Sequence, residues 1–428
     1  MTLYVLDTEL EIFQLSETQL VCKTSEEGMF FQIETSSPYS AAQLKAQALN
    51  YEGLSINVSF EHNQDGLVYF SIIGDESFYN MRALISSLRK DQHISICANE
   101  DIEHSKKLTG FEEFHFIPTT FPELSYDEID ISSTFLGNKF NAPLFVTGMT
   151  GGIKQGGAIN KKIALACQKY GIPMGVGSQR IALEHPEYSD IFDVKKFAPD
   201  LFLIGNIGAA QLAKGLDEKS CQMAVDMIGA DALAIHVNVL QEVIQVEGDR
   251  DFSNLFSKIE KVCKQLSVPV IIKEVGSGMD IVSAKKLVEC GVSAIDVGGA
   301  GGTSWGFIEG LRTSDQKTRN LASQFRNWGI PTAYSLNALV CGGVDIPITA
   351  TGGIRDGLTV AKSVSLGANM AGVGLPIFKA ALKDDPNAVD AVLEEFIEAV
   401  KITAMLTGSQ NLKQLKGKLI KGLPYSNL

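Results

Sequence analysis

The chain has 428 residues, a formal net charge of −13 and a hydrophobic content of 45%. This composition predicts a soluble globular protein with a sizeable core, and the length favours two domains. The negative charge argues against nucleic acid or an anionic membrane as partner, although a local basic site for a phosphorylated substrate remains compatible with it. Residues 1–9 do not resemble a signal peptide, and no apolar run is long enough to span a bilayer, so we expect a cytoplasmic protein.

Residues 1–85 are expected to form a small α+β accessory domain. Alternating or apolar runs predict strands over residues 10–15, 28–33, 54–60 and 67–73. Good helix formers predict a helix over residues 40–49, and a second helix is expected over 77–88. We find no catalytic constellation in this segment, so its role is not predicted.

From residue 142 onward the chain repeats one unit, in which a short apolar strand with a glycine or polar end precedes an amphipathic helix. The eight predicted strands span residues 142–146, 173–176, 201–204, 233–236, 269–272, 294–297, 347–350 and 370–373. Eight such units predict a (β/α)8 TIM barrel within residues 86–428. A doubly wound open sheet is the alternative, but it would not gather all eight strand ends on one face.

The stretch 236–242 combines an imidazole, two amides and a carboxylate at the end of one predicted strand. His236 and Asn238 are two residues apart and would share a strand face, and Gln241 and Glu242 follow in the expected loop. Four polar groups after an apolar run are costly to bury unless they bind something. This set suits a hard cation together with a small polar ligand, although an ordinary polar turn is the simpler alternative.

Two glycine-rich turns occupy the positions where barrels of this kind bind phosphate. Residues 352–357 follow the seventh predicted strand, and Gly374 with Leu375 follows the eighth, where Pro376 would lie in a first helical turn. Backbone N–H groups at such helix starts favour a phosphate. Lys273 ends the fifth predicted strand, where it would either face an anionic group such as reduced flavin or form a salt bridge with Glu274 or Asp296.

Together these motifs resemble the type 2 isopentenyl-diphosphate isomerases, which are FMN-dependent barrels. The resemblance covers roughly residues 86–410 and agrees in the order and spacing of many motifs. The matching motifs are 89–94 (RKDQHI), 149–152 (MTGG), 177–180 (GSQR), 236–238 with 241–242 (HVN and QE), 247–252 (EGDRDF), 273–274 (KE), 299–305 (GAGGTSW), 328–332 (WGIPT) and 351–355 (TGGIR).

The resemblance implies roles for many of these residues and for their neighbours at the strand ends. The substrate diphosphate would be bound by Arg89, Lys90, Ser178, Gln179 and Arg180. FMN would be held by Thr147, Gly148, Met149, Thr150, Ser178, Asn206, Lys273 and Thr303, and its phosphate by Gly352, Gly353, Ile354, Gly374 and Leu375. Gln241 would lie against the allylic carbons, with His236 and Asn238 as further catalytic residues, and Glu242 would ligate Mg²⁺.

The implied reaction is the 1,3-allylic proton shift that converts isopentenyl diphosphate into dimethylallyl diphosphate in isoprenoid biosynthesis. It would use reduced FMN and Mg²⁺, with NADPH as reductant, in a homo-oligomer that the resemblance makes a tetramer or an octamer.

One position departs from the family pattern. The sixth strand usually ends Asp-Val-Ser-Gly, whereas this chain has Gly298 in place of the serine, which puts one expected FMN contact in doubt.

Three other functions are weighed against this one. An FMN oxidoreductase of the hydroxyacid-oxidase or dihydroorotate-dehydrogenase class would share the barrel, and His236 is its only candidate base. An enzyme similar to inosinate dehydrogenase would need a cysteine in the loop 301–305, which has none. A non-catalytic flavin or phosphate sensor is disfavoured by the intact set of Gln241, Glu242 and Lys273.

Overall fold

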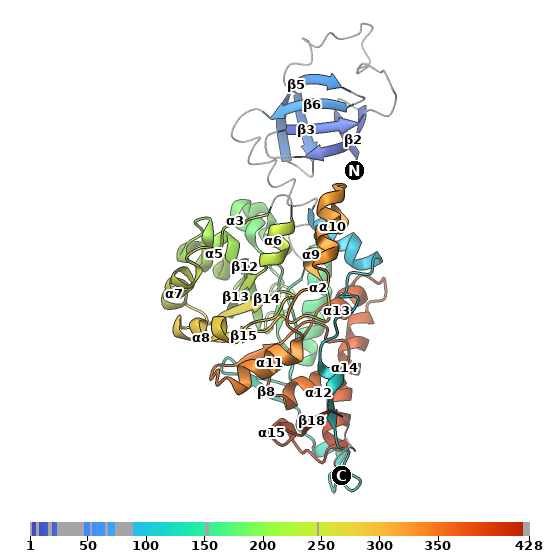
Figure 1. Ribbon diagram of the computed structural model, residues 1–428, viewed down its shortest axis with the longest axis vertical. Coiled ribbons are helices and arrows are strands. Elements are labelled where there is room, and N and C mark those ends of the chain that lie inside the picture. The colour runs from blue at the N-terminus through green and yellow to red at the C-terminus, as the bar shows by residue number, and fades with distance from the viewer. Residues whose placement is uncertain are drawn as a thin grey trace. The chain divides into compact units, whose positions relative to one another are not determined.

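The computed structural model describes residues 2–5, 8–15, 19–23, 47–51, 54–64, 67–72, 89–149, 154–245 and 248–422 (Figure 1). The chain divides into two compact units, residues 1–91 and 92–428.

The first unit contains a six-stranded antiparallel sheet with the strand order β1-β2-β3-β6-β5-β4. Its strands are β1 (Thr2–Val5), β2 (Thr8–Leu15), β3 (Gln19–Lys23), β4 (Gln47–Tyr51), β5 (Leu54–Gln64) and β6 (Leu67–Ile72). The helix predicted over 40–49 is wrong at its end, because residues 47–49 belong to β4, which pairs with β5. Cross-strand pairing overrides local helix propensity there. The strand predicted over 28–33 and the helix predicted over 77–88 lie outside the described residues.

The second unit is a closed barrel of eight parallel strands, which confirms the predicted TIM barrel and excludes the open sheet. The strands are β10 (Leu144–Val146), β11 (Met174–Gly175), β12 (Leu203–Gly208), β13 (Ala232–Val237), β14 (Val270–Glu274), β15 (Ala294–Asp296), β16 (Ile348–Ala350) and β17 (Met370–Val373). Closure comes from the parallel pairing of β10 with β17, in which Leu144 is aligned with Ala371 and Val146 with Val373.

Helices follow the strands and cover the outside of the barrel, as α5, α7 and α8 do in Figure 1. The helices are α2 (Lys154–Tyr170), α3 (Arg180–Glu184), α4 (Ala209–Ala213), α5 (Glu218–Ile228), α6 (Val239–Ile244), α7 (Leu255–Gln265), α8 (Ile281–Glu289), α9 (Trp305–Arg312), α10 (Gln316–Gln324), α11 (Thr332–Cys341), α12 (Gly357–Ser365), α13 (Leu375–Ala381), α14 (Ala388–Leu406) and α15 (Leu412–Leu415). Short 3-10 helices span η1 (Phe111–Glu113), η2 (Tyr126–Glu128) and η3 (Pro186–Ile191). Among the described residues, none of these helices has the length and apolar character needed to cross a membrane.

The barrel interior is filled by apolar side chains from the strands and from a hairpin that precedes them. The hairpin joins β8 (Ser133–Phe135) to β9 (Asn138–Phe140), and its turn residues Leu136 and Gly137 both have positive φ. Phe135 and Phe140 pack with Phe145 of β10 in this inner core. A second small sheet pairs β7 (Phe114–Phe116) with β18 (Leu419–Lys421). The core leaves the carboxyl ends of the strands available for polar groups, as this fold requires.

Candidate active site

Two polar residues on neighbouring strands, Asn206 and His236, form one part of the candidate site. Asn206 lies within β12, which extends past the predicted end at residue 204, and His236 lies in β13. The parallel register of these strands brings the two side chains together, and His236 Nδ1 lies 2.7 Å from Asn206 Oδ1. The hydrogen bond fixes the ring orientation of His236 at the barrel mouth.

Asn238, Gln241 and Glu242 form one hydrogen-bonded group at the start of α6. The prediction that Asn238 shares a strand face with His236 is wrong, because β13 ends at Val237 and Asn238 is the N-cap of α6. Gln241 and Glu242 accordingly lie in a helix rather than in a loop, and spacings of three and four residues bring them beside Asn238. Asn238 Nδ2 donates to Gln241 Oε1 at 3.1 Å and to Glu242 Oε1 at 3.0 Å.

A second carboxylate, from α9, completes this group. Gln241 Nε2 donates to Glu309 Oε1 at 2.8 Å, and His93 Nε2 lies 3.0 Å from the same oxygen. Arg312 forms an ion pair with Glu309 Oε2. Burial raises the pKa of Glu309, but the charges and hydrogen bonds of His93, Arg312 and Gln241 outweigh it and lower the pKa to about 2. Gln241 therefore faces a carboxylate that stays ionised at neutral pH.

Sequence reasoning did not single out Glu309. Its side chain is fully buried, and its only local signal is the arginine three residues later on the same helix. A buried acid of this kind is retained only with partners, which here come from two distant segments.

Lys273 has a carboxylate partner inside the barrel. Lys273 Nζ lies 2.8 Å from Asp296 Oδ2 and 3.1 Å from Thr351 Oγ1, and Thr351 donates to Asp296 Oδ1 at 2.7 Å. Of the two partners considered from the sequence, Asp296 rather than the carboxylate of Glu274 pairs with the ammonium group. Lys273 is still 12% exposed, so one side of it remains available to a ligand at the mouth.

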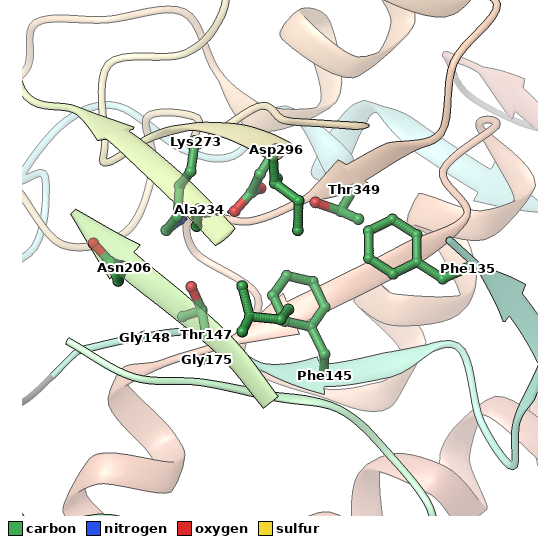
Figure 2. Close-up of a pocket in the computed structure, with 12 residues that line it drawn as sticks. Phe135, Phe145, Thr147, Gly148, Gly175, Asn206, Ala234, Lys273, Asp296 and Thr349 are labelled. Carbon is green, nitrogen blue, oxygen red and sulfur yellow. Dashed lines mark hydrogen bonds and ion pairs between the residues drawn. The ribbon is translucent and has the colours of Figure 1, made fainter. Parts of the chain in front are cut away.

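A small cavity lies between these groups, with a volume of about 20 Å³. Figure 2 shows Lys273 and Asp296 at one side of it, with Asn206 and Thr147 opposite. Thr147 Oγ1 is buried and has no hydrogen-bond partner within the described part of the chain. An unsatisfied buried hydroxyl costs free energy, which a polar ligand at this place would recover. Most residues that line the cavity are apolar, and its polar side chains, Thr147, Asn206, Lys273, Asp296 and Thr349, are the groups that would meet the polar edge of a flavin ring.

The glycines predicted to hold FMN lie where loops approach each other closely. A Cβ at Gly374 would lie 3.0 Å from Met149 Sδ and 3.2 Å from a Thr147 methyl group. A Cβ at Gly148 would lie 3.2 Å from Asn206 Nδ2. The loops after β10 and β17 thus approach each other, and the loop after β10 also approaches Asn206 of β12.

The loops after β15 and β16 are equally close to each other. A Cβ at Gly302 would lie 2.3 Å from the backbone nitrogen of Gly353, and Gly352 has a φ of 101° that favours glycine. Ile354 is buried, so only its backbone could meet a phosphate. Thr303 follows Gly302 in this loop, whereas Thr150 lies outside the described residues. The helix starts predicted after the seventh and eighth strands, β16 and β17, are confirmed, because α12 begins at Gly357 and α13 at Leu375.

Gly298, the departure from the family pattern, occupies a position that excludes a side chain in this structure. Its φ is 50°, and a Cβ there would lie 1.9 Å from the carbonyl oxygen of Glu274. A serine would need a different path of the loop after β15. Glycine at this position therefore allows the loop after β15 to pass close to β14.

The residues predicted to bind the substrate diphosphate lie in two separate segments of the chain. In the loop after β11, Gln179 is fully buried, and its amide donates to Ala224 O and accepts from Asn206 N. This geometry gives the Gln179 side chain a structural role and leaves Ser178 and Arg180 as the side chains predicted to bind diphosphate. Arg89 and Lys90 belong to the first unit, and their role stays a prediction.

Glu242 is the residue predicted to hold Mg²⁺. Its Oε2 accepts from the backbone N–H of Asp249 at 2.8 Å, and the neighbouring Asn238 Oδ1 is buried without a hydrogen-bond partner among the described residues. No cluster of three or more His, Cys, Asp or Glu side chains suited to a metal occurs in the described part of the chain. Mg²⁺ commonly takes one carboxylate with substrate phosphates and water, so this donor set fits a cation brought by a diphosphate.

Comparisons with known proteins show which family this chain is related to. Residues 209–422 match the family model for FMN-dependent dehydrogenases. The chain is 45% identical over 330 residues to an isopentenyl-diphosphate delta-isomerase of Nostoc, covering 77% of this chain and 93% of that protein. It is 43% identical over 339 residues to one of Thermococcus onnurineus, covering 78% and 90%, and 44% identical over 328 residues to one of Rickettsia bellii, covering 77% and 95%.

Solved structures show a likeness of fold alone. A mandelate oxidase has a TM-score of 0.52 and 18% identity over 80% of this chain and 97% of that chain. A barrel with an FMN-family match, together with extensive identity to named isomerases from bacteria and archaea, identifies the relationship. This chain belongs to the FMN-dependent isopentenyl-diphosphate delta-isomerase family.

Proposed function

We propose that this protein interconverts isopentenyl diphosphate and dimethylallyl diphosphate by a 1,3-allylic proton shift, as a step of isoprenoid biosynthesis. The observation that carries the proposal is the group of Asn238, Gln241, Glu242 and Glu309 at the barrel mouth. In this group the Gln241 amide is held between Asn238 and the carboxylate of Glu309, and Asn238 also donates to the carboxylate of Glu242. The named relatives support the substrate.

In this mechanism the protein supplies position and charge. Reduced FMN, when bound, would supply the proton-transfer chemistry at the alkene without net redox change. Gln241 would lie against the allylic carbons, and its amide is oriented by Asn238 on one side and by the ionised Glu309 on the other. Oriented dipoles of this kind stabilise positive charge as it develops on the allyl group.

The other residues of the mouth would hold the two charged ligands. Lys273 would face the flavin, with Asp296 and Thr351 keeping its ammonium group in place. Glu242 would bind Mg²⁺ together with the substrate diphosphate. Arg180 and Ser178 would bind the same diphosphate, and the resemblance gives that role to Arg89 and Lys90 as well. Fixing the diphosphate fixes the position of the alkene, which lowers the entropic part of the barrier.

NADPH is proposed as the reductant that maintains reduced FMN. The protein is proposed to act in the cytoplasm as a homo-oligomer, either a tetramer or an octamer.

An anaerobic assay tests the proposal directly. The full-length protein is loaded with FMN, reduced with dithionite and incubated with Mg²⁺ and isopentenyl diphosphate in D₂O. We expect dimethylallyl diphosphate with deuterium incorporated, detected by NMR, and little product with oxidised FMN. Absence of the allylic isomer from the fully reduced protein would show that the proposed function is wrong.

The alternative is an FMN oxidoreductase acting on a small hydroxy acid, which the match to the FMN-dependent dehydrogenase model favours. Its base would be His236, whose Nδ1 is engaged by Asn206. Starting from oxidised FMN under anaerobic conditions, this alternative predicts flavin reduction by a hydroxy acid, seen as bleaching of the flavin absorbance. The isomerase proposal predicts no such bleaching.

A further inference from the structure

The turn at residues 248–249 folds back onto the helix that carries Gln241 and Glu242. Gly248 donates its N–H to Gln245 O at 3.1 Å, and a Cβ at Gly248 would lie 2.0 Å from the carbonyl oxygen of Glu242. Only glycine permits this approach. It brings the next backbone N–H, that of Asp249, within 2.8 Å of Glu242 Oε2. One carboxylate oxygen of Glu242 is therefore oriented by the backbone of this turn.

The side chain of Asp249 points to a different part of the structure. It is 2% exposed and forms an ion pair with Lys214, which is the C-cap of α4 and belongs to the preceding strand–helix unit. Neither carboxylate oxygen of Asp249 makes a hydrogen bond within the described residues, so the ammonium group of Lys214, whose side chain is 61% exposed, is the charge partner of this buried carboxylate. Leaving the carboxylate without it would be costly. Burial lowers the pKa of Arg180, but the negative charges of Glu184, Asp249 and Glu242 raise it overall, so Asp249 contributes to the electrostatic field at Arg180.

Helix α4 is itself anchored to the segment that follows the turn. Lys258 of α7 donates to Leu212 O at 2.7 Å and to Ala213 O at 2.9 Å, which caps the carboxyl end of α4. Lysine at a helix carboxyl end satisfies carbonyls that have no partner within the helix. Asp249 of the turn and Lys258 of α7 thus both contact the carboxyl end of α4.

We propose that Lys214 and Asp249 are positioning residues for the cation and diphosphate end of the site. The ion pair holds the turn, and the turn's backbone N–H orients the Glu242 carboxylate. This inference rests on the proposed function, because Glu242 is taken there as the Mg²⁺ ligand. Partners that orient a metal ligand commonly change metal affinity by about 10–100-fold when removed.

The substitution Lys214→Met distinguishes positioning from simple electrostatics. Removing a positive charge near a cation site should strengthen cation binding if charge alone matters. Loss of positioning should instead weaken it. Lys214→Arg keeps the ion pair, and Lys285→Met removes the charge of an exposed lysine on α8 as a matched control.

The measurement is Mn²⁺ binding, by electron paramagnetic resonance, to the full-length FMN-loaded protein with isopentenyl diphosphate and oxidised flavin. We expect Lys214→Met and Asp249→Asn to weaken binding about tenfold or more, with FMN content unchanged. Lys214→Arg and Lys285→Met should bind as the wild type does. A melting temperature for each variant identifies any general loss of folding.

Unchanged or tighter Mn²⁺ binding by a folded Lys214→Met variant would overturn this inference alone. The same weakening in Lys285→Met would also overturn it, since the effect would then be unspecific. If the wild type itself binds no Mn²⁺ with substrate present, both the assignment of Glu242 as metal ligand and this inference are wrong.

Discussion

Gln241 Nε2 donates to Glu309 Oε1 at 2.8 Å, across 68 positions of the sequence. One residue lies on α6 and the other on α9, and these helices follow different strands of the barrel. The hydrogen bond sets which end of the Gln241 amide faces Asn238. It also joins Gln241, the proposed catalytic residue, to the buried and ionised carboxylate of Glu309. Substitutions of either residue therefore test whether the orientation of the amide matters.

Shortening Gln241 by one methylene group should lower turnover far more than substrate affinity. In Gln241→Asn the amide cannot reach both Asn238 and Glu309, so kcat and kcat/KM should fall together, by about a hundredfold or more. Steady-state kinetics with reduced FMN measure both constants. Gln316→Asn, at an exposed position of α10, is the control and should behave as the wild type. A rise in KM alone would instead make Gln241 a binding residue.

Glu309→Gln should destabilise the protein in a pH-dependent way. The pKa of Glu309 is about 2 in the folded state, below its ordinary value of 4.5, so ionisation favours folding. That contribution is complete above about pH 4.5 and is lost as the pH falls toward 2. We expect the variant to lose about 3 kcal/mol of unfolding free energy at pH 6, because Arg312 loses its buried partner. The difference from wild type, measured by urea unfolding, should shrink at pH 3, and a constant difference would contradict the assignment.

Glu242→Gln should spare FMN binding and remove the dependence of activity on Mg²⁺, together with most of the activity. The amide can still accept the Asp249 N–H but lacks the negative charge that a hard cation requires. The measurement is turnover as a function of Mg²⁺ concentration, with flavin content determined from absorbance. Turnover that Mg²⁺ stimulates as in the wild type would rule out Glu242 as the metal ligand.

Replacing Gly298 by the serine usual in the family should destabilise this particular protein. The new Cβ would meet the carbonyl oxygen of Glu274 and would also occupy a left-handed backbone conformation. Gly343→Ser shares the positive φ but has open space around its Cβ, so it should lose only about 1 kcal/mol. Thermal unfolding and FMN titration should show a clearly larger loss for Gly298→Ser. Equal effects in the two variants would mean that the loop after β15 adjusts without cost.

Removing residues 1–85 should leave a folded barrel that binds FMN. The barrel closes between β10 and β17, and its core is built from residues between Ile94 and Leu415. We expect weaker diphosphate binding, because Arg89 and Lys90 would lie at a new chain end. Flavin content, oligomer size and isomerase kinetics of the truncated and full-length proteins should be compared. An insoluble or flavin-free product would show that both parts fold as one cooperative unit.

The sequence by itself determined the barrel and the general position of its site. Apolar runs that alternate with helical periodicity favour parallel strands covered by helices, and eight such units fit a closed barrel better than an open sheet. The polar residues at the strand ends, such as His236 and Lys273, had then to meet on one face. The glycine-rich turns before α12 and α13 were equally visible, because a helix start after a strand has a local signature.

Only the tertiary structure decided the partners of those residues. Periodicity does not show that α6 begins at Val239, since the stretch before Gln241 is compatible with strand or helix and packing against α9 decides it. Nor does it identify Glu309, which reaches Gln241 through the closure of the barrel and not through any local spacing. Tertiary structure also decides that Lys273 pairs with Asp296. The register between β14 and β15 aligns these two residues. Local sequence specifies elements, while burial and strand register specify which charged groups must pair.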